Sequence, residues 1–261
     1  MILARLSRAV REQNWFAVAL EFVIVIAGVV IGFQIANWNA EQQQQIARDR
    51  YLAEIADDLR ADIAEIETTI AAARIRAHAA RYILSEIEDF DPDQFTAGTQ
   101  MAQAQNGTLL TDVLVSIYQG PVEIGDPEDY VAAFTMLTLV IDSSQGTYQE
   151  LQSTGNLGVL GDRDLIAALR RYYSVLESER DGDTINRSRF LELMNVMRDN
   201  GIAFHDPIPI GDLREAVAAN PRLRAELQLT RGHGHWQIFR LSSFLATAIE
   251  TLALVEQAGN E

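Results

Sequence analysis

Few residues of this chain could bind a metal or act in catalysis, and their spacing does not fit the usual sites. His233 and His235 lie two residues apart, whereas histidines that bind zinc from one helix are usually three or four residues apart. A local turn with two surface imidazoles is the better interpretation of this pair. The chain of 261 residues contains no cysteine, which excludes disulfides, thiolate metal sites and a cysteine nucleophile.

An acidic cluster matches a calcium loop only in part. Asp181, Asp183 and Glu192 occupy positions 1, 3 and 12 of such a loop. Positions 5 and 6 hold Ile185 and Asn186, so an oxygen ligand and the glycine of the sharp turn are both missing. We predict no metal site in this segment.

The sequence also lacks the usual catalytic and phosphate-binding motifs. Gly155, Gly158 and Gly161 supply the glycines of a phosphate loop, but no strand pattern precedes them. The formal net charge is −16. Residues 1–38 contain three Arg and two Glu, so residues 39–261 carry −17 and would be repelled by phosphate backbones. The sequence therefore predicts no catalytic residue, no cofactor and no nucleic-acid partner.

One carboxylate, that of Glu21, lies inside an otherwise apolar run. This run, 16–36, has 21 residues and would span about 31 Å as a helix, close to the hydrocarbon thickness of a lipid bilayer. We predict a transmembrane helix over 15–38, with Trp15 and Trp38 as anchors in the two interfaces. A cleaved signal peptide and a buried core helix are the alternatives, but the run is longer than a signal peptide's ~7–15 apolar residues.

The arginines near this helix predict its orientation. Arg5, Arg8 and Arg11 precede the helix, whereas Arg48 is the first basic residue after it and has acidic neighbours. Positive charge at the ends of a first helix tends to stay in the cytoplasm. We expect residues 1–14 to be a cytoplasmic tail in the bacterial inner membrane, with the remainder of the chain in the periplasm.

Small residues and Glu21 share one side of the predicted transmembrane helix. Gly28 and Gly32 form a pair with a spacing of four, which Ala36 extends, and such residues let a second helix approach closely. At 100° per residue, Glu21 lies on the same side. The sequence predicts a face that binds another transmembrane helix, from a second copy or from another protein. Alternatively, Glu21 reaches the cytoplasmic interface and has no partner.

Five residues in this helix and directly after it follow a pattern known from a bacterial family. Glu21, Gly28, Gln34, Trp38 and Asn39 fit E-x6-G-x5-Q-x3-W-N. The pattern resembles the anchor of the uncharacterised family known only as domain of unknown function 6090.

A second element of that family has a counterpart further along the chain. The family's Y-x-x-L-x-S-x-G-N-L element is matched by Tyr148, Leu151, Ser153, Gly155 and Asn156, and a Tyr-Tyr pair follows at 172–173. Together the two motifs cover about a fifth of the chain. The resemblance implies a membrane-anchored helical protein and implies no established activity.

Beyond the anchor, apolar residues recur with four-then-three spacing. The sequence predicts a long helix over 41–89, as in a coiled coil or a long bundle helix. Alanines at 73, 77 and 80 favour a close antiparallel neighbour from the same chain, and a parallel homodimeric stalk is the alternative. The stripe consists of Leu52, Ala56, Leu59, Ile63, Ile66, Ile70, Ala73, Ala77, Ala80, Leu84 and Ile87.

The remaining chain reads as further helices separated by breakers. Asn200-Gly201 is a normal helix end, and Asn220-Pro221 is a normal helix start. The sequence predicts an all-α fold in which residues 39–261 form one domain, with a helical bundle over about 91–258. The expected helices are 93–105, 109–119, 128–143, 147–154, 163–180, 184–199, two short ones opening at Gly211-Asp212 and Asn220-Pro221, and a final one at 234–257.

Two classes of function fit these observations. The first is a noncatalytic accessory or scaffolding subunit, whose anchor binds a partner helix in the membrane. The second is a sensor-like or enzymatic domain with a ligand site between helices. Because the sequence offers no catalytic constellation, we favour the first class and expect no enzyme activity.

Overall fold

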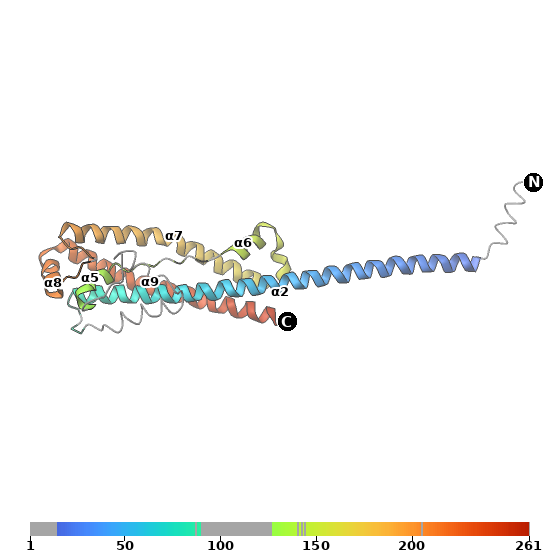
Figure 1. Ribbon diagram of the computed structural model, residues 1–261, viewed down its shortest axis with the longest axis horizontal. Helices are drawn as coiled ribbons and strands as arrows, with labels where there is room; N and C mark the ends of the chain where they lie inside the picture. Colours follow the sequence, from blue (N-terminus) through green and yellow to red (C-terminus); the bar gives the residue numbers. More distant parts are fainter. Residues whose placement is uncertain are drawn as a thin grey trace, which may run out of the picture. The chain divides into compact units, whose positions relative to one another are not determined.

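The computed structural model describes residues 15–86, 88–89, 127–139, 141, 143, 145–204 and 206–260, without the side chains of 15–18, 127, 181 and 183–186. Every regular element in these residues is a helix, which confirms the all-α fold class (Figure 1). By its contacts the chain divides into two units, Met1–Tyr51 and Leu52–Glu261.

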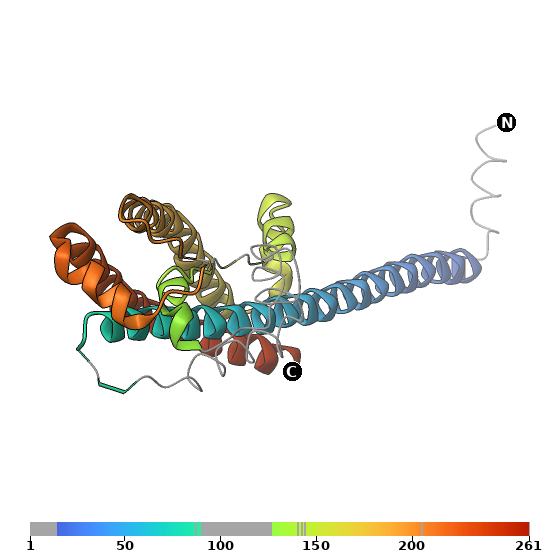
Figure 2. The same ribbon diagram turned by 60° about the vertical axis from the view of Figure 1, so that its left-hand side comes forward.

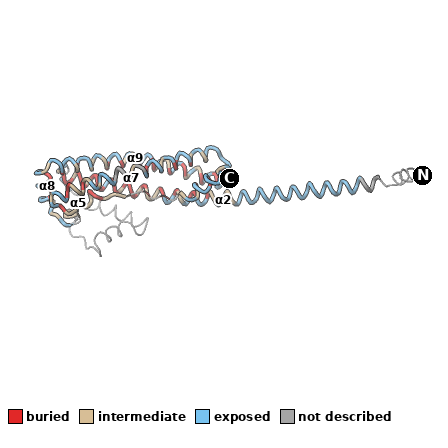
Figure 3. Tube along the Cα trace, turned by 90° about the horizontal axis from the view of Figure 1, so that it is seen from above, coloured by how far each residue is buried: buried red, intermediate tan, exposed pale blue. Residues whose placement is uncertain are grey.

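The first unit contains the beginning of helix α2, which runs from Trp15 to Ile83. Every residue from 19 to 46 is exposed (Figure 3). The helix continues through Gly28 and Gly32, and no atom outside the local helix lies within 4 Å of where a Cβ would stand at either glycine. This segment makes no packing contact that would explain its apolar composition.

Helix α2 ends at Ile83, six residues before the predicted end at residue 89. Ser85 has a φ of 61°, in the left-handed region. Its N–H donates to the Tyr82 carbonyl, and the Glu86 N–H donates to the Arg81 carbonyl, at 3.0 Å each. These two bonds form a Schellman motif, which satisfies the last carbonyls and turns the chain away. The sequence does not reveal this end, because a glycine usually marks the motif and a serine stands here instead.

Three long helices form the core of the second unit: α2 from Leu52 onward, α7 (Arg163–Asp199) and α9 (Pro221–Gly259) (Figures 1 and 2). Arg60 of α2 pairs with Glu256 of α9 at 2.7 Å, and Arg231 of α9 pairs with Glu86 just beyond the other end of α2. Helix α9 is therefore antiparallel to α2.

The predicted apolar stripe of α2 is the buried face of the helix. Of its described members, eight are buried, and Ile63 and Leu84 are half-buried. A Cβ added to Gly234 of α9 would stand 2.9 Å from the Ala77 Cβ and 3.2 Å from the Ala73 carbonyl oxygen. The alanines thus face a close antiparallel helix of the same chain, in agreement with the interpretation favoured from the sequence.

Shorter elements pack at the two ends of these helices. Near the end of α2 lie η1 (Pro127–Tyr130), α5 (Val131–Phe134) and α8 (Ile210–Ala219). They close a core that includes residues of α2, α7 and α9. Towards the start of α7 lie α6 (Gly146–Ser153) and η2 (Asn156–Leu160). The predicted helix at 147–154 and the helix opening near 211 are confirmed.

Three other predicted boundaries are wrong. Helix α7 is continuous, although a break was predicted between 180 and 184. Helix α9 is also continuous, so the predicted short helix after Asn220 and the final helix at 234–257 are one element. The predicted helix over 128–143 ends at Phe134. The predicted helices at 93–105 and 109–119 lie outside the described residues.

Contacts with neighbouring helices explain two of these differences, the continuity of α7 and the early end of the helix predicted over 128–143. Gly182 of α7 has no side chain, which leaves room for the guanidinium of Arg240 from α9. That guanidinium pairs with Glu179 of α7 at 2.8 Å. The Leu137 carbonyl, beyond α5, accepts a hydrogen bond from Arg76 of α2 at 3.1 Å. Packing against neighbouring helices thus overrides the local sequence signals.

Candidate functional site

The predicted partner-binding face belongs to the exposed part of α2. Glu21, Gly28, Gly32 and Ala36 are all exposed. At 100° per residue they lie within about 80° of one another on the helix. The face is thus present as an open surface with small residues at its centre.

The interface and motif residues of this segment are also open to solvent. Gln34 and Asn39 are exposed, and Trp38 has 62% of its surface exposed. Trp15 is helical, but its side chain is not described. None of the described polar side chains among them forms a catalytic or metal-binding group with another.

Two helices in the described part of the chain are long and apolar enough to cross a membrane. They are the part of α2 from Ala19 onward and helix α9. None of the most apolar window of α2 is buried, whereas 28% of the corresponding window of α9 is buried. The two helices therefore differ in how much of their apolar surface the rest of the chain covers.

The second predicted motif brings aromatic residues of α6 and α7 together. Tyr148 and Leu151 are buried, and the ring of Tyr148 stacks on that of Tyr173 with centroids 4.0 Å apart. Gly155 has a φ of 71° and begins the turn into η2. Ser153 and Asn156 are exposed, so the polar half of the motif forms a helix end and a turn rather than a reactive site.

A buried carboxylate that sequence analysis did not single out lies beside this motif. Asp62 of α2 is only 1% exposed. Its Oδ2 atom accepts a hydrogen bond from the Tyr172 hydroxyl at 2.5 Å and another from Ser143 Oγ at 2.7 Å. The ring of Tyr172 in turn stacks on Phe244 of α9. In the sequence, only the position of Asp62 beside the apolar stripe hinted at its burial. Its two partners could not be predicted, because they lie 81 and 110 residues further along the chain.

Burial dominates the electrostatics of this group. It raises the pKa of Asp62 above its ordinary value, although the bonds from Ser143 and Tyr172 act in the opposite direction. It also raises the pKa values of Tyr172 and Tyr173, and the negative charge of Asp62 adds to both shifts. Tyr172 therefore keeps its proton and donates it in a hydrogen bond. The group joins α2 to α7 and offers no exposed atom to a substrate.

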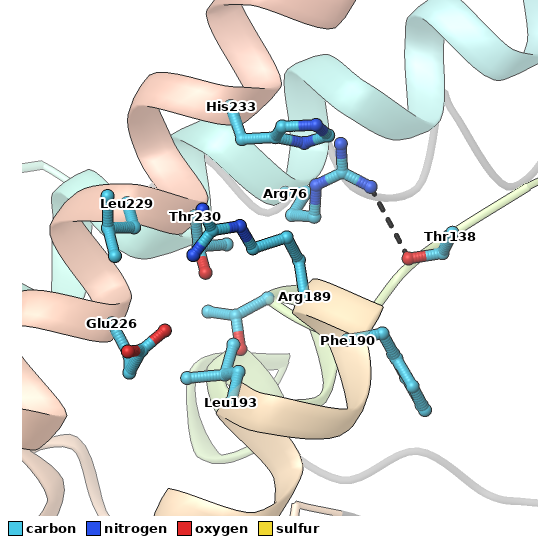
Figure 4. Close-up of a pocket in the computed structure, with 10 residues that line it drawn as sticks. Arg76, Thr138, Arg189, Phe190, Leu193, Glu226, Leu229, Thr230 and His233 are labelled. Atoms are coloured by element: carbon cyan, nitrogen blue, oxygen red, sulfur yellow. Dashed lines mark hydrogen bonds between the residues drawn. The ribbon is translucent and has the colours of Figure 1, made fainter. Parts of the chain in front are cut away.

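A small cavity lies further along the bundle, between α2, α7, α9 and the segment after α5. It has a volume of about 30 Å³. Its polar lining includes Arg76, Arg189 and His233, together with Thr138 and Glu226 (Figure 4). Ligand pockets for organic molecules are typically about 300–1,000 Å³. The cavity is far smaller than such a pocket but exceeds the ~10–15 Å³ that one water molecule needs, and two of its lining residues, Arg189 and Leu229, are exposed.

The weak metal candidates are not brought together. His233 faces this cavity, whereas His235 is exposed on the same helix. His78 of α2 is half-buried and lies on a different helix from this pair. Among the described residues, no group of three or more His, Asp or Glu could hold a metal ion.

No family model, curated protein or solved structure matches the chain. Its class is therefore defined by the fold and its surfaces: a three-helix bundle with added short helices, preceded by an exposed apolar helix with a small-residue face. The resemblance in the anchor and in the tyrosine motif stays a prediction.

Proposed function

We propose that this chain is a single-pass inner-membrane protein that acts as a noncatalytic accessory or scaffolding subunit of a membrane complex. Its N-terminus would lie in the cytoplasm, and its acidic helical domain would lie in the periplasm. The observation that carries the proposal is the apolar segment of α2 over 19–38, where every residue is exposed. These 20 residues span about 30 Å as a helix, as a bilayer requires.

The orientation is supported by arginine placement. Arg5, Arg8 and Arg11 precede the apolar segment, and acidic residues follow it. A reporter enzyme that is active only outside the cytoplasm, fused after Glu261, should therefore be active. Activity of a cytoplasm-only reporter at the same position, with silence of the first, would contradict the orientation.

The scaffolding role is supported by the small-residue face of the anchor. Replacing Gly28 and Gly32 together by Leu would block close helix approach without reducing hydrophobicity. Membrane insertion should survive, and association with the partner helix should weaken by about 1–2 kcal/mol. The matched control replaces Val23 and Val30 by Leu, because these residues lie on the opposite side of the helix.

Cross-linking in native membranes, followed by identification of the cross-linked proteins, measures this association. Loss of a stoichiometric partner in the glycine variant, but not in the valine variant, is the expected result. Glu21→Gln tests the charge, since it keeps size and hydrogen bonding and should matter only if an ionised Glu21 contacts the partner. If both double variants keep every cross-link, the segment is an anchor only.

A sensor-like domain is the second candidate function. One observation favours it: the cavity between the helices is lined by a buried arginine and two further basic side chains. Its volume of about 30 Å³ is small beside the ~300–1,000 Å³ of a typical pocket for an organic ligand. A ligand of this second candidate would have to be very small.

A further inference from the structure

Arg76 is a buried cation whose bonds all go to neutral groups. It is 6% exposed. Nη1 donates to the Leu137 carbonyl at 3.1 Å and to Thr138 Oγ1 at 3.4 Å, and Nη2 donates to Gln237 Oε1. None of the carboxylates in the described residues forms an ion pair with it. Burial lowers the pKa of Arg76 to about 10, so it remains charged at neutral pH.

An unpaired buried charge is costly, and proteins usually compensate it with an opposite charge. A guanidinium has five N–H donors, and the three bonds above use three of them. The unused donors belong to a side chain that lines the cavity. The cavity is therefore where a compensating negative charge could lie.

Two more basic side chains line the same cavity. Figure 4 shows the imidazole of His233 beside the guanidinium of Arg76, and Arg189 comes from α7 on another side. Burial lowers the pKa of His233, and the charges of Arg76, Arg240 and Arg189 lower it further. Glu226 also lines the cavity and is half-buried. A single carboxylate thus faces two arginines and a histidine whose lowered pKa favours its neutral form, in a chain whose net charge is −16.

We propose that this cavity binds one small monovalent anion of the size of chloride, held by Arg76 with the hydroxyls of Thr138 and Thr230 in the same lining. The volume of about 30 Å³ exceeds the ~10–15 Å³ that one water molecule needs, so the cavity has room for an anion as small as chloride. Water would fill the space but would leave the charge of Arg76 uncompensated. The site lies in the bundle and does not depend on the anchor, so its failure would leave the scaffolding proposal untouched.

Chloride binding can be measured on the full chain in an uncharged detergent. Sodium chloride is titrated against sodium gluconate at constant ionic strength, and the line width of the chloride NMR signal reports bound chloride. The wild type should broaden the signal in a saturable way. Absence of saturable broadening would overturn the proposal and leave water as the occupant.

Two matched variants locate the site. Arg189→Gln and Arg198→Gln each remove one exposed arginine of α7, but only Arg189 lines the cavity. Chloride binding should weaken in the first variant and stay unchanged in the second. Equal effects would mean that chloride responds to net charge alone, which would overturn the site.

Arg76→Gln tests the central contact. It should weaken chloride binding about tenfold or more, the fold-change expected for loss of one charge-assisted hydrogen bond. Circular dichroism shows whether this variant folds, and Thr138→Val provides a milder test at the same cavity. Unchanged affinity in a folded Arg76→Gln variant, or in both Thr138→Val and Arg189→Gln, would contradict the proposal.

Discussion

The apolar segment of α2 over 19–38, proposed above as the anchor segment, and helix α9 are both apolar enough to cross a membrane but have very different surroundings. The anchor segment is exposed along its whole length, and its two glycines have open space around them. In α9, Gly234 lies against Ala77, and both Gln237 and Arg240 bond to neighbouring helices. Apolar composition therefore does not distinguish a membrane helix from a core helix. The distinction lies in whether the same chain supplies a partner for the apolar face.

The sharpest way to break this comparison is to place one charge in each helix. Val25→Arg, in the middle of the anchor segment, should cost about 2.5–3.5 kcal/mol of insertion free energy and release the protein from membranes. Phe239→Arg is the matched control, because Phe239 is 69% exposed on α9. Alkaline extraction of membranes measures both. Release by Phe239→Arg but not by Val25→Arg would mean that α9 is the spanning helix.

A second prediction tests how much the buried hydrogen bonds of Asp62 stabilise the bundle. Asp62→Ala removes the acceptor of two buried hydroxyls, those of Tyr172 and Ser143. We expect a loss of about 2–4 kcal/mol in the free energy of unfolding, since buried donors without an acceptor each cost about 1–3 kcal/mol. Thermal unfolding followed by circular dichroism measures it. A loss below about 0.5 kcal/mol, typical of a surface position, would contradict this role.

The same carboxylate gives a pH dependence with a definite sign. Because the pKa of Asp62 is raised on folding, the folded state holds its proton more tightly than the unfolded state does. This contribution to stability is complete below the ordinary pKa and is lost as the pH rises through the raised value. The stability of the wild type relative to Asp62→Asn should therefore fall as the pH rises above about 4, the ordinary pKa of an aspartate. Glu177→Gln, at an exposed position of α7, is the control.

Two neighbouring glycines of α9 sharpen the comparison further. Gly234→Ala should destabilise the bundle by about 1–3 kcal/mol, because its Cβ would overlap Ala77. Gly232→Ala should stabilise it by about 0.5–1 kcal/mol, because open space surrounds this position and alanine favours a helix. Chemical unfolding of both variants measures the difference. The same sign for both would show that the contact between α9 and α2 is not close.

The smallest expected effect is at the end of α2. Ser85 and Gly201 occupy the same position of two Schellman motifs, with φ values of 61° and 73°. Only glycine adopts this conformation without steric cost. Ser85→Gly should therefore stabilise the protein by about 0.5–1 kcal/mol, and Gly201→Ser should destabilise it by a similar amount. A loss of stability in Ser85→Gly would mean that the serine side chain makes a compensating contact.

The sequence predicted the helical class and the buried stripe of α2 because both depend on local spacing. It also predicted the cap at Asn220, whose side-chain oxygen accepts bonds from two backbone N–H groups at the start of α9. It did not predict the continuity of α7 through Gly182, since the contact that supports it comes from Arg240, 58 positions later. The cavity could not be predicted from the sequence either. Arg76, Thr138 and His233 come from distant segments that only the packed bundle brings together.

The pair of glycines around His233 also has a consequence for motion. Each glycine inside a helix lowers its stability by roughly 0.5–1 kcal/mol relative to alanine, so this turn of α9 is held mainly by the helices beside it. Local unfolding of α9 should therefore begin here rather than at its capped start. Native-state hydrogen exchange should detect faster exchange of the amides at 232–236 than of those one turn away on either side. Such opening would give a small solute a route from solvent into the centre of the bundle.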